Sequence, residues 1–419
     1  MKLTQNILKP APQLTAIFVF ILICIATPIK AQQHISLPRT GFTPNDIAII
    51  INDDDPLSRE VGYYYQQARK IPETHMIHVR FPAQRNTLSP KEFKQLKTTI
   101  DQLTPNHVQA YAVAWTAPYR VGCMSLTSAL AFGFDKKYCA TTCAPTASSS
   151  YFNTQSLLPY DDYKLRPAMM LAGTSFKYVK ALIDRGIASD HSFPTGQAYL
   201  LKTSDKARSS RAAGFARAIH DLADVFSIQV LETNFISDRS DILFYFTGST
   251  NVPMLETLDF LPGALADHLT STGGMLTDSL QMSSLRWLEA GATASYGTVV
   301  EPCSYPQKFP FPLIAMFHYA LGASAIEAYW KSVAWPGQGV FIGEPLAKPF
   351  APLLQKVGPD QIEVRIFSPH ASHLKIEESP FAAGPFKRIP QHLTIHRGKN
   401  LFRFKFDEKN DDYLRLQWN

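Results

Sequence analysis

The feature that most constrains the fold of this chain is an alternation of apolar strands and amphipathic helices that begins near residue 46. The run 46–52 (DIAIIIN) is almost wholly apolar and β-branched, and 58–70 has the pattern of a helix. A strand is predicted over 76–81, a helix over 90–103 and a strand over 108–114. Strands that are apolar on both faces need cover on both faces, and strand–helix–strand units cross over with one hand. The alternation therefore predicts an α/β fold with a mainly parallel, doubly wound sheet.

The same alternation continues to about residue 350 after one interruption. Strands are predicted over 197–202, 228–231, 241–246, 292–296 and 340–342, and helices over 176–188, 209–226, 283–290, 311–321 and 324–335. The segment 261–274 is interpreted as the end of a helix followed by a glycine-rich turn. Residues 118–163, rich in Ser, Thr, Cys and aromatic side chains, are predicted to form a surface insertion. The predicted α/β domain thus spans 32–350.

The two ends of the chain have other patterns. A basic start, an apolar run over 14–26 and small residues before Gln32 are typical of a signal peptide over 1–31. Beyond residue 350, short alternating segments separated by Pro, Gly and Asn predict a small antiparallel β appendage over 351–419. Export places the chain in the periplasm or outside the cell. We expect no membrane span once the leader is removed, although an uncleaved anchor is the alternative.

Charge and cysteine content narrow the classes of partner and compartment. The formal net charge is +6, and three of the positive charges belong to leader lysines, so nucleic-acid binding is not expected. Cys123, Cys139, Cys143 and Cys303 follow the leader. In an oxidising compartment they predict one or two disulfides whose pairing the sequence leaves open. A zinc site at Cys139 and Cys143 would need two further ligands nearby, and none lies close in sequence.

Polar residues directly after the predicted strands are the candidates for a site, because ligands of open α/β sheets bind at the carboxyl ends of strands. Asn52, Asp53, Asp54 and Asp55 follow the first strand. Their oxygen atoms suit a hard divalent cation, the one cofactor this sequence suggests, or a polar ligand bound mainly through Asn52, Asp53 and Asp55. The alternative is an acidic loop in which Asp55 or Ser58 caps the next helix.

A second candidate group follows the strand 241–246. Thr247 and Gly248 come directly after it, and Gly273 and Gly274 form a pair that could bring backbone amides close to a ligand. Between them lie His268 and Ser271, which would share one face of a helix and could act as base and nucleophile. No Gly-x-Ser-x-Gly elbow accompanies them, and the alternative is a capped helix end.

Two carboxylates at later strand ends form a third candidate. Glu301 follows the strand 292–296, and Glu344 follows the strand 340–342. If both lie in one crevice, environments that separate their pKa values would make them an acid/base pair. The alternative is two carboxylates bonded to backbone amides in proline-bounded turns.

Several segments carry a resemblance to known families. YFTGS, LPGALADHLTSTGG, LEAGATASYGTVVEP and GEPLAKPF, together with NDDDPLSREVGYYYQQARKIP and RSSRAAGF, resemble an uncharacterised family of exported bacterial proteins over 47–350. More distantly, the order of these motifs resembles the caspase- and gingipain-like cysteine peptidases. That resemblance implies their fold, with a His-Gly after one strand and a Cys after the next. Here those places hold Thr247-Gly248 and Thr270-Ser271-Thr272, so the dyad of that chemistry is missing.

Three functions remain open from the sequence. The first is a non-peptidase relative that binds a ligand, a peptide or a protein partner at the strand ends. The second is a hydrolase that uses Ser271 with His268, or Glu301 with Glu344. The third is a structural or adhesion protein of the cell envelope that docks through the β appendage.

Overall fold

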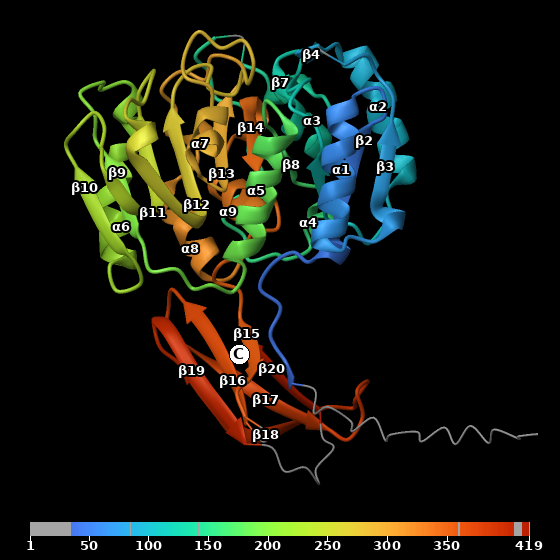
Figure 1. The fold of residues 1–419 in the computed structure, drawn as a ribbon, viewed down its shortest axis with the longest axis vertical. Helices are drawn as coiled ribbons and strands as arrows, with labels where there is room; N and C mark the ends of the chain where they lie inside the picture. The colour runs from blue at the N-terminus through green and yellow to red at the C-terminus, as the bar shows by residue number, and fades with distance from the viewer. Residues whose placement is uncertain (1–34, 84, 141, 359–360, 406–412, 419) are drawn as a thin grey trace, which may run out of the picture.

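The computed structural model describes residues 35–83, 85–140, 142–358, 361–405 and 413–418, and the predicted leader lies outside them. Figure 1 shows an α/β body with a β-rich unit below it, to which both described ends of the chain lead. The body has a ten-stranded sheet in the order β10-β9-β11-β12-β13-β14-β8-β5-β2-β3, with helices packed on both sides. The α/β class is therefore confirmed, with a sheet that is mixed.

The strands of the large sheet are β2 (Ile47–Asn52), β3 (Met76–Val79), β5 (Ala110–Val113), β8 (Ala168–Met170), β9 (Gln197–Leu201), β10 (Ser227–Leu231), β11 (Arg239–Gly248), β12 (Leu258–Leu269), β13 (Ala294–Thr298) and β14 (Gly339–Gly343). The helices are α1 (Pro56–Arg69), α2 (Pro90–Leu103), α3 (Leu126–Phe132), α4 (Pro159–Tyr163), α5 (Phe176–Ser189), α6 (Phe215–Leu222), α7 (Leu285–Ala290), α8 (Pro312–Ala320) and α9 (Ala325–Ser332).

Strand direction is uniform on either side of β14. Neighbours within β10-β9-β11-β12-β13 run parallel, as do those within β8-β5-β2-β3. β14 runs antiparallel to β13 and meets β8 through the single residue pair Ile342 and Met170. β2, which is apolar except for Asn52 at its end, is buried at every position, as expected for a strand covered on both faces.

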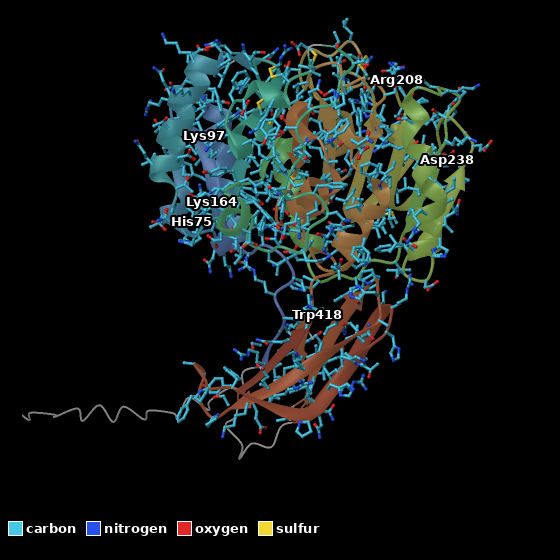
Figure 2. The ribbon with its side chains drawn as sticks, turned by 180° about the vertical axis from the view of Figure 1, so that it is seen from behind. His75, Lys97, Lys164, Arg208, Asp238 and Trp418 are labelled. Atoms are coloured by element: carbon cyan, nitrogen blue, oxygen red, sulfur yellow. A yellow bond between two sulfur atoms is a disulfide. The ribbon has the colours of Figure 1, made fainter. Side chains whose placement is uncertain are left out.

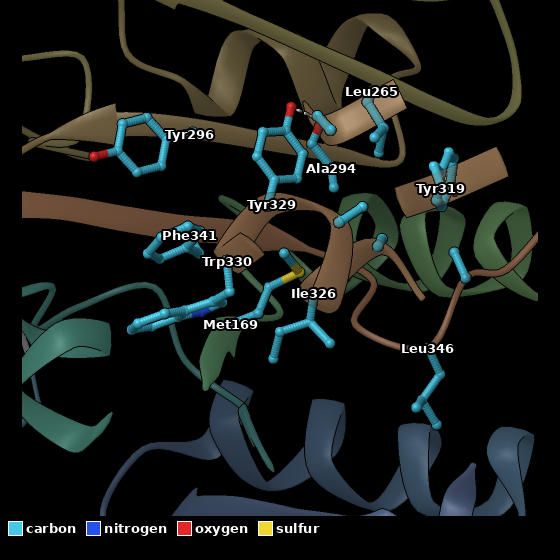
Figure 3. Close-up of a cluster of buried hydrophobic side chains, with 14 of the residues drawn as sticks. Met169, Leu265, Ala294, Tyr296, Tyr319, Ile326, Tyr329, Trp330, Phe341 and Leu346 are labelled. Carbon is cyan, nitrogen blue, oxygen red and sulfur yellow. Dashed lines mark hydrogen bonds between the residues drawn. The ribbon is translucent and has the colours of Figure 1, made fainter. Parts of the chain in front are cut away.

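Aromatic side chains of α9 fill the centre of the body (Figure 3). The Trp330 ring stacks on Phe341 of β14 with centroids 4.4 Å apart, and its Nε1 donates to the carbonyl of Ala168 at 2.9 Å. The Tyr329 hydroxyl donates to the carbonyl of Ala294 at 3.3 Å. Their large apolar areas are therefore buried without leaving a polar atom unpaired.

The segment 118–163 contributes more to the body than a surface insertion would. It carries β6 (Arg120–Val121) and β7 (Met124–Ser125), which join β4 (Thr87–Leu88) in a three-stranded sheet. It also carries α3, in which every residue from Leu126 to Ala131 is buried. Two disulfides, Cys123–Cys139 and Cys143–Cys303, tie this segment to itself and to the loop after β13.

The β-rich unit is a two-sheet sandwich. Its strands are β1 (Ile35–Ser36), β15 (Leu353–Lys356), β16 (Gln361–Ser368), β17 (Ser372–Ser379), β18 (Lys387–Ile395), β19 (Gly398–Lys405) and β20 (Tyr413–Trp418). The sheets β1-β20-β17-β18 and β15-β16-β19 enclose an apolar core that includes Val364, Leu374 and Leu416. The sequence did not indicate that β1, from the start of the described chain, would pair with β20.

Within the described ranges, we find no helix that is both long and apolar enough to cross a membrane.

Candidate ligand-binding site

The carboxyl ends of β2 and β3 open into a hollow of about 420 Å³ that α2 closes on one side, here called the β3–α2 hollow. This volume lies within the roughly 300–1,000 Å³ range of small-molecule sites. The apolar part of its lining is Val79, Phe81, Pro82, Leu88 and Leu96, and the polar part is Asp53, His78, Arg80, Arg85, Glu92, Gln95 and Thr99.

The turn after β2 directs Asp53 into this hollow. Asn52 links the two strand ends, because its Nδ2 donates to the carbonyl of Phe81 at 3.0 Å and its Oδ1 accepts from the Phe81 amide at 3.3 Å. Asp55 accepts from the Leu57 amide at 2.9 Å and caps α1. The capping interpretation is thus confirmed for Asp55, while Asp53, between the two, lines the hollow.

Asp53 and His78 form the polar centre of the hollow. Asp53 Oδ1 lies 2.7 Å from His78 Nδ1, and Asp53 Oδ2 lies 3.6 Å from an Arg80 guanidinium nitrogen. The His78 side chain is 36% exposed and that of Asp53 20%. A carboxylate on Nδ1 orients the imidazole and leaves Nε2 directed away from that carboxylate. Such a pair can donate to or accept from a ligand at Nε2.

One face of α2 forms the wall of the hollow. Glu92, Gln95, Leu96 and Thr99 are spaced so that they share that face. The capping box between Ser89 and Glu92 starts the helix at this point, as the Ser-Pro sequence predicted. The Glu92 carboxylate also accepts hydrogen bonds from two guanidinium nitrogens of Arg85, at 2.5 and 3.2 Å, so these two charges at the rim of the hollow are paired.

The hollow shares its edge of the sheet with the strand ends of β5 and β12. Asn86, after β3, donates to Asp278 at 2.8 Å, and the hydroxyl of Tyr119, after β5, also bonds to Asp278. Asp278 belongs to the loop that follows β12. The β sandwich packs at the opposite end of the body, so this edge faces away from it (Figure 1).

The first part of the segment 261–274, up to Leu269, belongs to a strand and not to the helix end that its sequence suggested. β12 covers Leu258–Leu269 and pairs with β11 and β13. Successive side chains of a strand point to opposite faces, so the side chains of Asp267 and His268 lie on opposite faces of the sheet. Asp267 meets Arg211 at 2.6 Å on one face, where burial raises its pKa to about 6.

His268 is enclosed on the other face of β12. Its Nδ1 accepts from Trp287 Nε1 at 2.9 Å, and its Nε2 contacts the Met282 carbonyl at 3.1 Å. Since the indole nitrogen can only donate, Nε2 carries the proton. Burial lowers the pKa of His268 to about 3, so the ring is neutral. Ser271 lies beyond the strand, where its carbonyl accepts from Thr298, and the structure does not bring it together with His268.

The predicted glycine sites pack backbone against backbone. A Cβ at Gly248 would lie 2.0 Å from the carbonyl oxygen of Arg208, and one at Gly274 would lie 2.4 Å from that of Gly297. The carbonyl of Gly273 accepts from Ser284, and Thr247 is buried beside Gly248. Packing therefore explains the residue type at Gly248 and Gly274, and a ligand-binding role for the four positions stays a prediction.

Glu301 and Glu344 lie far apart in the fold. Glu301 is exposed, and its Oε1 accepts from the Cys303 amide at 2.6 Å. Because β14 runs antiparallel to β13, Glu344 lies at the start of β13, where its amide donates to the Thr293 carbonyl. Its carboxylate is fully buried and bonded to Arg69 and Tyr65. An acid/base pair needs both groups in one crevice, and this geometry does not supply it.

The cation site suggested by the three aspartates is not supported by their partners. Asp54 pairs with Arg80 at 3.0 Å, Asp55 caps α1, and Asp53 faces His78. Across the described part of the chain, no cluster of three or more His, Cys, Asp or Glu side chains is placed to hold a metal ion.

Sequence reasoning missed most of the hollow, including His78, Arg80, Phe81 and Leu96. The signal that could have found them is the rule that ligands bind at the carboxyl ends of strands, because for the predicted strand 76–81 this rule points to 80–85. The helix face of α2 was readable from its spacing but had no polar motif to draw attention to it.

Comparison with known proteins gives little beyond this geometry. No family model and no curated protein matches the sequence. One solved structure, described as "Structure of Protease", is similar to this chain, with a TM-score of 0.38 and 9% sequence identity. The matched region covers 90% of this chain and 98% of the chain of that structure. A likeness of that strength carries no argument about activity.

Proposed function

We propose that this chain is an exported binding protein, a non-peptidase relative of the caspase- and gingipain-like proteins, that holds an extended peptide segment in the β3–α2 hollow. The observation that carries the proposal is the Asp53–His78 pair at 2.7 Å within a hollow of about 420 Å³ whose remaining lining is half apolar. Apolar surface with a few convergent polar groups at strand ends is the usual composition of a binding site.

The position of β3 favours a peptide over a compact ligand. β3 is the outermost strand on its side of the large sheet, so one of its edges faces away from β2. An extended peptide can pair with such an edge and place alternate side chains in an adjoining hollow. The charged residues of the lining balance, with Asp53 and Glu92 against Arg80 and Arg85, which favours a segment without large net charge.

The fate of the candidate catalytic groups supports binding over peptide hydrolysis. The four cysteines of the described part are in disulfides, and His268 is neutral within the core. The strand-end positions where a dyad would stand carry Thr247 and Thr270–Thr272. Disulfides also favour an oxidising compartment, so we place the protein in the periplasm or outside the cell.

The test is a screen of labelled short peptides by fluorescence anisotropy, with two matched variants on α2. Thr98 and Thr99 are both exposed, and each hydroxyl donates to the carbonyl four residues earlier, but only Thr99 lines the hollow. Thr99→Arg should reduce the affinity of a bound peptide at least roughly tenfold by filling the hollow, and Thr98→Arg should leave it unchanged. His78→Ala should also weaken binding.

Two results would contradict the proposal. One is peptide binding that Thr99→Arg and His78→Ala both leave intact, which would move the site elsewhere. The other is cleavage of the peptides that His78→Ala abolishes, because Asp53–His78 would then act as a general base in a hydrolase.

A further inference from the structure

A second hollow, of about 290 Å³, lies between α2, α3 and the segment around α4, and we call it the basic hollow. Its lining is Lys97, Asp101, Leu130, Ala131, Tyr160, Lys164 and Arg166. Figure 2 labels Lys97 and Lys164, which lie on the same face of the molecule. Lys97 comes from α2, and Lys164 and Arg166 come from the segment directly after α4, so the fold brings two separate segments together.

Arg166 is the fixed element of this hollow. It is only 6% exposed, and its Nε donates to the carbonyl of Val108 at 2.8 Å. Its guanidinium carbon lies 3.2 Å from the centroid of the Tyr160 ring and 5.8 Å from that of Tyr111. The charged head therefore cannot swing out to solvent, and it is held in one orientation.

The positive charges of the basic hollow are only partly compensated. The Lys97 ammonium lies 2.5 Å from both carboxylate oxygens of Asp101, so this pair is neutral. Within the described ranges, the ion pairs include neither Lys164 nor Arg166. The Lys164 ammonium lies 5.3 Å from the centroid of the Tyr160 ring, so two cations share one ring. Lys164 is exposed, but Arg166 is buried, and a buried charge without a carboxylate partner is costly, which favours a bound counter-ion.

We infer that the basic hollow binds a phosphate group. The two uncompensated cations match a phosphate monoester, which carries about −1.5 to −2 charges at neutral pH. A guanidinium and an ammonium together can donate to its three terminal oxygens, and the planar fork of a guanidinium can bind two of these oxygens at once. The volume is near the lower limit of small-molecule sites, so the phosphate carries at most a small organic part or is the headgroup of a lipid.

This inference is independent of the proposed peptide binding. The β3–α2 hollow uses Glu92, Gln95, Leu96 and Thr99 of α2, whereas the basic hollow uses Lys97 and Asp101 on another side of the same helix. Loss of one activity by substitution should therefore leave the other in place.

The test uses the whole protein and three probes. Inorganic phosphate and glycerol phosphate are titrated by calorimetry at low salt, and vesicles that contain phosphatidic acid are tested by flotation. Lys164→Gln removes an exposed cation from the hollow without touching the buried Arg166. Lys94→Gln, on an exposed position of α2 outside the hollow, makes the same change of net charge and is the matched control.

Binding of at least one probe by the unaltered protein, weakened roughly tenfold by Lys164→Gln and unchanged by Lys94→Gln, is the expected result. Lys97→Gln should weaken binding as well, because it leaves the Asp101 carboxylate unpaired beside the anion. Binding of vesicles alone identifies a lipid headgroup as the source, and binding of the soluble probes identifies a free phosphate. Absence of binding to all three probes, or equal loss in Lys94→Gln and Lys164→Gln, would overturn the inference.

Discussion

Arg69 holds the carboxylate of Glu344 with two nitrogens: its Nε donates to Oε1 at 3.0 Å, and its Nη2 donates to Oε2. The Tyr65 hydroxyl donates to the same Oε1 at 2.7 Å, and Asp190 receives the third guanidinium nitrogen. Arg69 ends α1 and Glu344 follows β14, so the pair joins a helix to a strand at the edge of the sheet opposite the β3–α2 hollow. Both carboxylate oxygens of Glu344 therefore have hydrogen-bond partners within the fold, which accounts for this residue by a structural role.

Glu344→Gln should destabilise the protein by about 3–5 kcal/mol, because it leaves Arg69 buried with one carboxylate fewer. Urea unfolding followed by circular dichroism measures the change. Arg69→Met combined with Glu344→Leu should cost less than the sum of the single variants, since both charges leave together. A Glu344→Gln protein of normal stability would contradict this assignment and reopen a functional role.

The buried histidines His268 and His318 should lower the stability of the protein as the pH drops below about 6.5. The pKa of His268 is lowered by burial from 6.5 to about 3, so in this range the unfolded chain binds a proton that the folded protein does not. Each such histidine costs about 1.4 kcal/mol per pH unit until the pH reaches the folded pKa. Burial also lowers the pKa of His318 to about 3, so this histidine adds a similar slope to the dependence of stability on pH.

His268→Gln isolates this contribution, because glutamine can accept from Trp287 and does not titrate. Urea unfolding between pH 6 and pH 4 should show a slope smaller by about 1.4 kcal/mol per pH unit than in the unaltered protein. Equal slopes in the two proteins would mean that His268 is charged in the folded state.

The two disulfides should differ in their contribution to stability. Cys143–Cys303 closes a loop with a sequence separation of 160, and Cys123–Cys139 one of 16. Loop-closure entropy predicts a loss of about 5 kcal/mol for Cys143→Ala with Cys303→Ala and about 3 kcal/mol for the other pair. Denaturant titration gives both values, and the reduced, unaltered protein is the control. A larger loss for the shorter loop would contradict the entropic account.

The β sandwich should depend on the α/β body through Phe367. This side chain of β16 is 5% exposed and packs with Phe350 and Phe226 at centroid distances of 4.6 and 5.6 Å. Phe367→Ala should cost about 3–5 kcal/mol in thermal or urea unfolding. Phe381→Ala, at a position 64% exposed in the same unit, should change stability by less than about 0.5 kcal/mol. Similar effects for the two variants would mean that the sandwich is independent.

Substitutions at Asp53 and Asp55 should have different effects, because Asp53 is proposed to bind the ligand and Asp55, two positions away, caps a helix. Asp55→Ala removes the cap of α1 and should cost about 1 kcal/mol without changing peptide affinity. Asp53→Asn should weaken peptide binding while stability, measured by urea unfolding, changes by less than about 0.5 kcal/mol. Reversed effects would place the functional carboxylate at Asp55.

Local chemistry was sufficient to predict many of the elements. The Ser89-Pro90 start and Glu92 mark α2, and the run of isoleucines marks β2, because caps and β-branched runs act within a few residues. β12 shows the limit of this reasoning. Its Leu- and Ala-rich sequence favours a helix locally, but pairing with β11 and β13 outweighs that preference.

The amino-acid sequence by itself determined the α/β class, the alternation of elements and the capping role of Asp55, since each depends on neighbours along the chain. Only the tertiary structure decided which strand ends meet. Parallel pairing of β2 with β3 places Asp53 beside His78, and the reversal of direction at β14 sends Glu344 to the other edge. Strand order and direction arise from contacts between residues remote in sequence, and hydrophobic periodicity carries no information about them.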